Sequence, residues 1–210
     1  MSKPNRYLMT QSLLSAFNYV FYCAEEQEEK AFADFVKTLR REKTPTTEAQ
    51  QDGIDFEKAV IDFTVGKETP DKRWGETYKE VAEKVKGGTY QTVGIKEVTI
   101  DGIDFLLYGK ADCLLYNTIY DIKFSKSYEY QKYFTSPQHP MYFELFNGVN
   151  RFVYVVSDGK YVYTEIYYKQ DTRLISFEIS TFIDYLKTTN FDGQNLFEIY
   201  KKNWVSEDRK

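Results

Sequence analysis

Three charged residues near the middle of the chain have the types and spacing that metal-assisted hydrolysis requires. Asp112 lies in one short apolar segment, and Asp121 and Lys123 lie in the next, with Asn117-Thr118 between them. If Asn117-Thr118 is a two-residue turn, Asp112 faces Lys123. The three charged side chains then share one face of a hairpin, because side chains alternate along a strand. A register slipped by one residue would instead bury Asp112 in the apolar layer of the opposite face.

This arrangement suits a site for a hard divalent cation. Two carboxylates aimed at one point repel each other, and each tends to stay protonated unless a cation offsets them. Mg²⁺ and Mn²⁺ prefer oxygen ligands, and a water on such a cation is a nucleophile for phosphodiester hydrolysis. The Lys123 ammonium would hold this water and stabilise charge in the transition state. Taken alone, the three residues fit equally well a buried Asp112–Lys123 salt bridge, with Asp121 capping a strand end.

The period of the apolar residues indicates which elements position this cluster. Residues 1–88 have the helical period, residues 89–170 are mainly strands, and residues 171–210 return to the helical period. We therefore expect one mixed α/β domain of 210 residues around a single sheet, with extra helices at both ends.

The expected helices have capping or charge signals at their ends. Those in the first part of the chain are expected to begin at Thr10, near Glu25, at Thr46 or Thr47, and at Asp71. A further helix is expected over residues 128–134, with a stop near Pro137 and a continuation to about Phe146, and the last two over residues 177–186 and 194–204.

The expected strands cover residues 90–100, 103–116, 119–124, 152–156 and 161–168. Asp101-Gly102 predicts a tight hairpin turn between the first two, since both residues tolerate a positive φ. Gly94 is a candidate bulge in the first strand.

Composition narrows the class of protein. The chain has 28 basic and 32 acidic residues, a net charge of -4, which argues against a uniformly basic DNA-binding surface but not against a local basic groove. Its two cysteines are too few for a disulfide framework or a four-thiolate metal site. No apolar run approaches the ~18 residues of a membrane span, and no signal peptide is evident, so we expect an intracellular protein without a membrane partner.

The charged cluster is the centre of a longer series of motifs. In chain order these are Ser12 to Phe17 before Cys23, Gly53-Ile-Asp-Phe-Glu57, Gly109-Lys-Ala-Asp112, Asp121-Ile122-Lys123 and Gln138-His-Pro-Met-Tyr142. Over residues 7–146 this series resembles the PD-(D/E)xK nuclease superfamily, in particular its RecB-like exonuclease branch, which includes CRISPR-associated and phage nucleases. The resemblance implies a restriction-endonuclease-like core, a central mixed sheet flanked by helices.

The resemblance also implies a metal site for Mg²⁺ or Mn²⁺. Asp112 and Asp121 would ligate the metal, with the carbonyl of Ile122 as a further oxygen ligand. Glu57 would complete or support the site from its helix; many members of the branch have histidine at this position. Because no cysteine follows Cys113, the iron–sulfur cluster of some members is not expected here.

Three further residues receive catalytic roles from the resemblance. Lys123 would orient the water and stabilise the transition state, while Gln138 and Tyr142 would position the lysine or the scissile phosphate from one face of a helix. His139, the sole histidine, is expected to be a surface or rim residue.

Residues near the motifs could contact DNA, single- or double-stranded. Phosphates could meet the basic residues Lys110, Lys126, Lys132 and Arg151, and unpaired bases could stack on Tyr128, Tyr130, Tyr133 and Phe134. Solvent-exposed charge is an equally good explanation for the first set, and helix packing is the expected role of at least two members of the second.

These features lead to one main hypothesis and two rivals. The main one is a metal-dependent nuclease acting on DNA, as an exonuclease in recombination, repair or phage replication, with or without a protein partner. The first rival is a nuclease-fold module that binds DNA or a protein without cleavage, and the second is a structural subunit of a recombination complex. The complete set of Asp112, Asp121 and Lys123 favours the enzyme, since a pure binder gains little from it.

Overall fold

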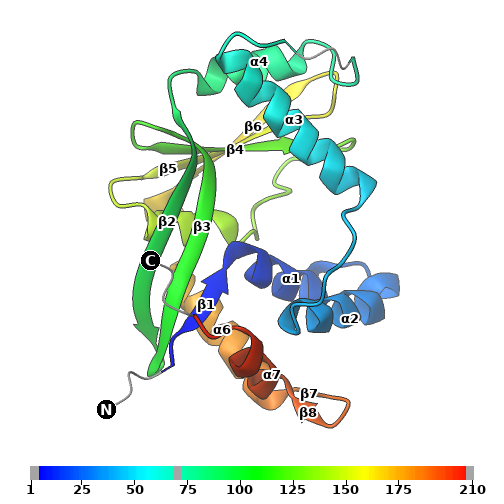
Figure 1. Ribbon diagram of the computed structural model, residues 1–210, viewed down its shortest axis with the longest axis vertical. Coiled ribbons are helices and arrows are strands. Elements are labelled where there is room, and N and C mark those ends of the chain that lie inside the picture. Colours follow the sequence, from blue (N-terminus) through cyan, green and yellow to red (C-terminus); the bar gives the residue numbers. More distant parts are fainter. Residues whose placement is uncertain (1–4, 69–71, 207–210) are drawn as a thin grey trace.

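One six-stranded mixed sheet runs through the molecule, with helices on both of its faces (Figure 1). The computed structural model describes residues 5–68 and 72–206. The strands are β1 (Tyr7–Thr10), β2 (Thr89–Ile100), β3 (Ile103–Leu115), β4 (Thr118–Phe124), β5 (Arg151–Ser157) and β6 (Val162–Tyr168). Their order is β1-β3-β4-β5-β6, with β2 paired to β3. The expectation of a mixed α/β structure around one central mixed sheet is confirmed.

The long strand β3 organises the sheet. Strand β2 pairs antiparallel along nearly its whole length, which occupies one edge of β3. The other edge is shared: β1 pairs in parallel with residues 105–108, and β4 pairs antiparallel with residues 113–115. Between these two partners, residues 109–112 of β3 have no strand beside them on that edge among the described strands. The second motif of the sequence therefore lies at a gap in the sheet.

The β2–β3 hairpin is the one that the sequence predicts. Asp101 and Gly102 both have left-handed backbone angles, φ 51° and 73°, and Ile100 pairs with Ile103. The bulge predicted at Gly94 is wrong, because the ladder continues through the pair Gly94–Gly109. A Cβ on Gly94 would lie 2.8 Å from the ring of Phe146, so the missing side chain makes room for helix packing.

The β3–β4 hairpin differs from the prediction by two residues. Leu115 pairs with Thr118, so the turn residues are Tyr116 and Asn117, and Tyr116 has φ 55°. Continued by one step past the last pair, this register places Asp112 opposite Asp121 rather than opposite Lys123. A shift of two leaves every side chain on its predicted face, because the side-chain period of a strand is two.

The helices are α1 (Gln11–Tyr22), α2 (Glu28–Leu39), α3 (Glu48–Thr64), α4 (Thr77–Val85), α5 (Gln138–Leu145), α6 (Ile175–Thr188) and α7 (Leu196–Asn203). Thr10 caps α1 by accepting from the Leu13 amide, and Thr47 caps α3 in a reciprocal capping box with Gln50. No helix of the described residues combines the length and apolarity needed to cross a bilayer.

Some expected elements take another form. The predicted cap Asp71 lies outside the described residues, and α4 begins only at Thr77. Residues 128–134 form turns rather than a helix, with Gln131 at φ 65°, and α5 begins at Gln138. Residues 1–88 also contain β1, which the periodicity does not indicate. Short strands β7 (Asn190–Phe191) and β8 (Gln194–Asn195) precede α7.

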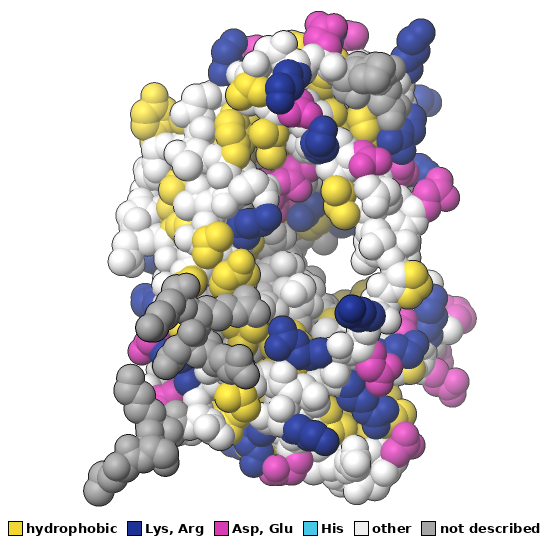
Figure 2. Space-filling model, viewed as in Figure 1, with side chains coloured by type: hydrophobic (Ala, Val, Ile, Leu, Met, Phe, Trp, Pro, Cys, Tyr) yellow, Lys and Arg dark blue, Asp and Glu magenta, His cyan; other side chains and the backbone are white. Residues whose placement is uncertain are grey.

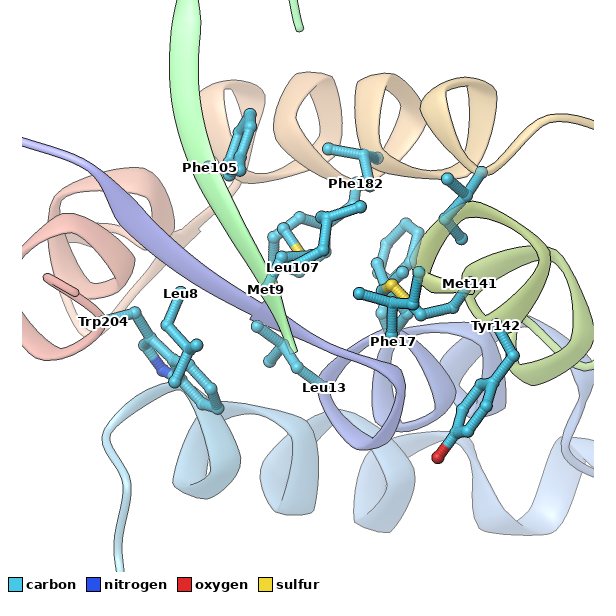
Figure 3. Packing of buried hydrophobic residues seen from close by; sticks show 14 of the residues in the cluster. Leu8, Met9, Leu13, Phe17, Phe105, Leu107, Met141, Tyr142, Phe182 and Trp204 are labelled. Carbon is cyan, nitrogen blue, oxygen red and sulfur yellow. The ribbon is translucent and has the colours of Figure 1, made fainter. Parts of the chain in front are cut away.

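The buried side chains form two hydrophobic clusters. The larger cluster joins β1, β3 and β5 to helices α1, α2, α5, α6 and α7 (Figure 3). The smaller cluster packs α3 and α4 against β3, β4 and β5, with Phe56, Val60 and Trp74 among its buried residues. Helices α2 and α3 are consecutive in the chain but belong to different clusters, so the connection between them crosses from one cluster to the other.

Candidate metal centre

A cleft of about 710 Å³ lies between the two hydrophobic clusters and includes the gap beside β3. The sequence-predicted site residues that line it are Glu57, Asp112, Asp121, Ile122, Lys123, Gln138 and Tyr142. They come from two strands and two helices: Asp112 from β3, residues 121–123 from β4, Glu57 from helix α3, and the last two from helix α5. The structure thus brings every predicted site residue to one cleft.

The two aspartates are held by contacts of different kinds. Asp112 Oδ2 accepts a hydrogen bond of 2.8 Å from the backbone amide of Ile122, which replaces the ladder bond that β4 would otherwise make there. Asp121 is 3% exposed, and its Oδ1 accepts a hydrogen bond from Gln138 Nε2. Its Oδ2 lies 2.7 Å from Lys123 Nζ, yet no donor meets this buried oxygen with hydrogen-bond geometry.

The charges of this group influence one another strongly. Burial raises the pKa of Asp112 well above its usual range, and the neighbouring Asp121 carboxylate raises it further, while Lys123 opposes both. Burial on its own would lower the pKa of Lys123, but Asp121 and Asp112 together raise it, so its ammonium stays charged. On the sheet side of the cleft, Lys123 therefore pairs with Asp121, while Asp112 is disposed to keep its proton until a further cation offsets its charge.

Glu57 approaches the cleft from the opposite side. It is half-buried on α3, and its Oε1 accepts a hydrogen bond from Gln91 Nε2 of β2. Burial raises the pKa of Glu57, and the Asp121 carboxylate adds to the rise. Sequence reasoning missed Gln91. Its backbone has a positive φ of 54° between two regular ladder pairs, a feature that no local pattern announces.

Helix α5 closes the cleft through two side chains one turn apart. Besides Gln138, Tyr142 donates a hydrogen bond of 2.8 Å to the backbone carbonyl of Lys110, in the part of β3 where, among the described strands, only β2 lies alongside. Figure 3 shows the Tyr142 ring at the margin of the larger cluster, with its hydroxyl pointing away from the other labelled side chains. A Cβ on Gly109 would lie 2.8 Å from Leu145 and 3.3 Å from Tyr142, so glycine is needed for α5 to lie this close.

His139 is not the surface or rim residue that we expected. It is 4% exposed, its ring stacks on Tyr167 with centroids 4.2 Å apart, and its Nδ1 lies 3.2 Å from the Tyr154 hydroxyl. Burial lowers its pKa to about 4. Because successive residues of a helix point in different directions, Gln138 can enter the cleft while His139 enters the core.

The basic residues that were predicted to contact phosphates fall into two groups: one lines the cleft, and the others are bound to protein groups. Lys110 is exposed and lines the cleft, whereas Lys126 forms ion pairs with Glu48 and Asp52 at the start of α3. Other basic groups have protein partners as well: Lys132 donates to the Ser127 carbonyl, and Arg151 to the Thr118 hydroxyl.

Of the four aromatic residues proposed to stack on bases, two are partly buried and pack against other rings. Tyr128 stacks on Tyr163 and Tyr133 on Tyr154, whereas Tyr130 and Phe134 are exposed. At least two of the four therefore serve in packing, as expected, but they pack against strands β5 and β6 rather than within a helix.

The residues of the cleft have the ligand chemistry that a hard divalent cation requires, but they do not form a complete set of ligands. All the candidate ligands supply oxygen atoms, and the buried Asp121 Oδ2 is contacted by the Lys123 ammonium at 2.7 Å without hydrogen-bond geometry, so it could also accept a cation. Among the described residues, however, no three acidic, histidine or cysteine side chains are already grouped as a metal site. The fit therefore rests on Asp112 and Asp121, and Glu57 does not join them as a third preformed ligand.

Comparison with known proteins adds likenesses of fold only. No protein-family model matches the sequence, and no curated protein matches it. Among solved structures, the chain is similar to the crystal structure of SSO0001, with a TM-score of 0.46 and 11% identity over 91% of this chain and 81% of that one. It is also similar to Rai1 of Scheffersomyces stipitis, with a TM-score of 0.37 and 14% identity over 89% of this chain and 62% of that one.

Proposed function

We propose that this protein is a divalent-metal-dependent nuclease that hydrolyses DNA phosphodiester bonds. The observation that carries the proposal is the convergence of Asp112, Asp121 and Lys123 on adjacent strands in one cleft. With the motifs around them, these residues fit a restriction-endonuclease-like core of the RecB-like exonuclease branch. An exonuclease of recombination, repair or phage replication is the form of the activity that the resemblance favours.

Each residue has a chemical task in this proposal. Asp112 and Asp121 would hold Mg²⁺ or Mn²⁺, with the Ile122 carbonyl as a further oxygen. The cation would supply an activated water and neutralise charge on the phosphate. The Lys123 ammonium donates to the attacking water or to a phosphate oxygen, and its raised pKa keeps it charged at neutral pH.

Two more residues support this centre. Gln138 donates a hydrogen bond to Asp121 Oδ1, which leaves the second oxygen, Oδ2, to contact Lys123 and the cation. Glu57 is half-buried on the opposite side of the cleft. It would offset the charge of the cation, either by binding the cation directly or through a water bound to it. Because burial and Asp121 raise its pKa, it keeps its proton more readily when no cation is present.

The rival is a binding module that keeps the fold without cleavage. The observation in its favour is the excess of acidic over basic residues, 32 against 28, which weakens general attraction to polyanions. A bound cation would locally reverse the sign of the cleft, so this observation does not decide between the two hypotheses.

The test is incubation of the purified protein with end-labelled single- and double-stranded DNA in Mg²⁺, Mn²⁺ or chelator. We expect cleavage only with a metal, and loss of cleavage in Asp121→Asn. The matched control is Asp184→Asn, which changes an exposed aspartate on α6 and should cleave normally. Binding without cleavage under every metal condition would establish the rival.

A further inference from the structure

Near the start of the long strand β2, the backbone of Gln91 leaves the extended conformation. Residues 89–100 of β2 pair with residues 103–114 of β3 in one register, and Gln91 is the only residue of this part of β2 without a pair. Its φ is 54°, in the left-handed region that a glutamine rarely adopts. The register is the same before and after Gln91, so the deviation is not a bulge with an extra residue.

Hydrogen bonds on both sides of Gln91 hold this conformation. The Thr92 hydroxyl donates a hydrogen bond of 3.2 Å to the carbonyl of Thr89. The ring of Tyr90 packs against the smaller hydrophobic cluster, and its hydroxyl donates a hydrogen bond of 2.8 Å to the Val85 carbonyl. An unfavourable backbone angle persists only where the surrounding structure imposes it, and such angles are frequent at functional sites. The surroundings of Gln91 therefore impose an angle that its side chain has to justify.

The side chain of Gln91 joins the sheet to helix α3. Its Nε2 donates a hydrogen bond to Glu57 Oε1. Within the described part of the chain, this is the only hydrogen bond or ion pair that the Glu57 carboxylate makes. The orientation of this half-buried carboxylate therefore depends on one donor.

The position of Gln91 in the sheet also brings it to a candidate metal ligand. The ladder pairs before and after Gln91 place it directly across from Asp112 on β3. Glu57 and Asp112 line the same cleft. In the orientation of Figure 1, Figure 2 shows the surface hollowed between the upper part of the molecule, which contains α3, and the lower part, which contains α1. The cleft is therefore open to a cation from solvent.

A neutral amide suits this place better than a charged donor. The Gln91 amide can fix the Glu57 carboxylate without offsetting its charge, whereas a lysine or arginine would compete with a cation for that charge. Gln138 makes the same kind of bond to Asp121 on the other side of the cleft. Carboxylates that act on a metal are commonly oriented by hydrogen bonds of this type, from groups that do not touch the metal.

We propose that Gln91 is a positioning residue of the metal centre, whose amide holds the Glu57 carboxylate toward the cation bound by Asp112 and Asp121. This inference rests on the metal centre of the proposed function and adds a residue to it. Gln91 touches neither the cation nor the DNA and acts only through Glu57. Its left-handed backbone is the consequence of directing a strand residue at a helix while β2 stays paired with β3.

Calorimetric titration of the DNA-free protein with Mn²⁺ tests this inference without cleavage. Gln91→Met keeps about the same side-chain length but removes the amide, so Mn²⁺ affinity should fall by about 10–100-fold, the usual cost of losing a group that orients a metal ligand. The matched control is Gln51→Met, which removes an exposed amide bonded to Asp55 on the same helix and should bind Mn²⁺ like the wild type. Unchanged or tighter binding by Gln91→Met would overturn the inference.

A double-mutant cycle separates positioning from a general effect on the fold. In protein that already carries Glu57→Gln, Gln91→Met should cause little further loss of Mn²⁺ affinity, because the carboxylate through which Gln91 acts is gone. A further loss as large as in the wild-type background would show that Gln91 acts independently of Glu57, which contradicts the inference.

Gln91→Gly gives a second variant in case the methionine variant does not fold. Glycine adopts a positive φ freely, and this relief offsets the greater freedom of the unfolded chain. Its melting temperature should therefore stay close to that of the wild type, while its Mn²⁺ affinity falls as in Gln91→Met. A lowered melting temperature with unchanged Mn²⁺ affinity would give Gln91 a structural role only and would overturn its positioning role.

Cleavage kinetics separate this inference from the nuclease proposal. Excess Mn²⁺ should bring the single-turnover rate of Gln91→Met close to that of the wild type, because the variant loses metal affinity rather than the chemistry that follows. A rate that stays low in saturating Mn²⁺ would overturn the inference. Weaker Mn²⁺ binding by Gln91→Met, in a protein that never cleaves DNA, would support the inference and reject the nuclease. Equal Mn²⁺ binding by wild type and variant, in a protein that cleaves DNA, would reject the inference alone.

Discussion

The two sides of the cleft hold their acidic residues by different means. On the sheet side, Asp112 and Asp121 lie on adjacent strands and are contacted by a backbone amide, by Lys123 and by Gln138. On the helix side, Glu57 extends from α3 and meets the side chain of Gln91. Strand pairing determines the first set, whereas the second depends on how helix α3 packs on the sheet in the smaller cluster. We infer that the sheet side supplies the rigid part of the centre and the helix side its adjustable part.

The largest effect should come from breaking the sheet side. Lys123→Met and Asp121→Asn should each lower the cleavage rate by about 10²–10³-fold, the usual cost of removing a group that stabilises transition-state charge. Single-turnover cleavage in Mn²⁺ measures the change, with Asp184→Asn as the control. Cleavage at the wild-type rate by either variant would show that the sheet side is not the catalytic centre.

The second largest effect is the change of unfolding free energy with pH that buried His139 should cause. Because the folded-state pKa of His139 is lowered to about 4, the unfolded chain binds more protons between about pH 4 and 6.5. Stability from this residue is therefore present above that window and lost as the pH falls through it, by about 3 kcal/mol in all.

Urea unfolding of the wild type and of His139→Phe between pH 4 and 7 measures this difference. The phenylalanine keeps a ring against Tyr167 but removes the titrating group, so the difference in unfolding free energy between the two proteins should shrink or reverse as the pH falls. A pH-independent difference would mean that folding does not change the pKa of His139.

A smaller effect is expected on the helix side. Glu57→Gln should weaken metal affinity or activity by about 10–100-fold, as for groups that support rather than make the metal bonds. Excess Mn²⁺ should restore much of the rate, and calorimetry in buffers of different ionisation enthalpy should detect fewer protons released on metal binding. A loss as large as that of Asp121→Asn, without rescue by metal, would remove the distinction between the two sides.

The smallest effect should come from the hydroxyl of Tyr142. Tyr142→Phe keeps the ring in the core but leaves the Lys110 carbonyl without this donor, at a cost of about 0.5–1.5 kcal/mol in unfolding free energy. Thermal denaturation measures it, and Tyr130→Phe, on an exposed ring, is the matched control. A rate loss comparable to that of Lys123→Met would instead give the hydroxyl a direct part in the reaction.

Local signals predicted the parts of the fold that depend on neighbouring residues. Thr10 and Thr47 cap helices because a side-chain oxygen meets an amide three residues away, and Asp101-Gly102 turns because both residues adopt a positive φ. The same signals failed at residues 128–134, where Tyr128 and Tyr133 follow partners on β5 and β6 rather than a helical period.

By itself, the sequence determined which side chains meet in the cleft and the face of the sheet on which each charge lies. Alternation along a strand has a period of two, so it excludes a slip of one residue but not the two-residue shift that sets Asp112 opposite Asp121. Tertiary structure alone decided that register, the burial of His139 and the bond from Gln91 to Glu57. Each of these depends on contacts between segments far apart in the chain, which no local pattern records.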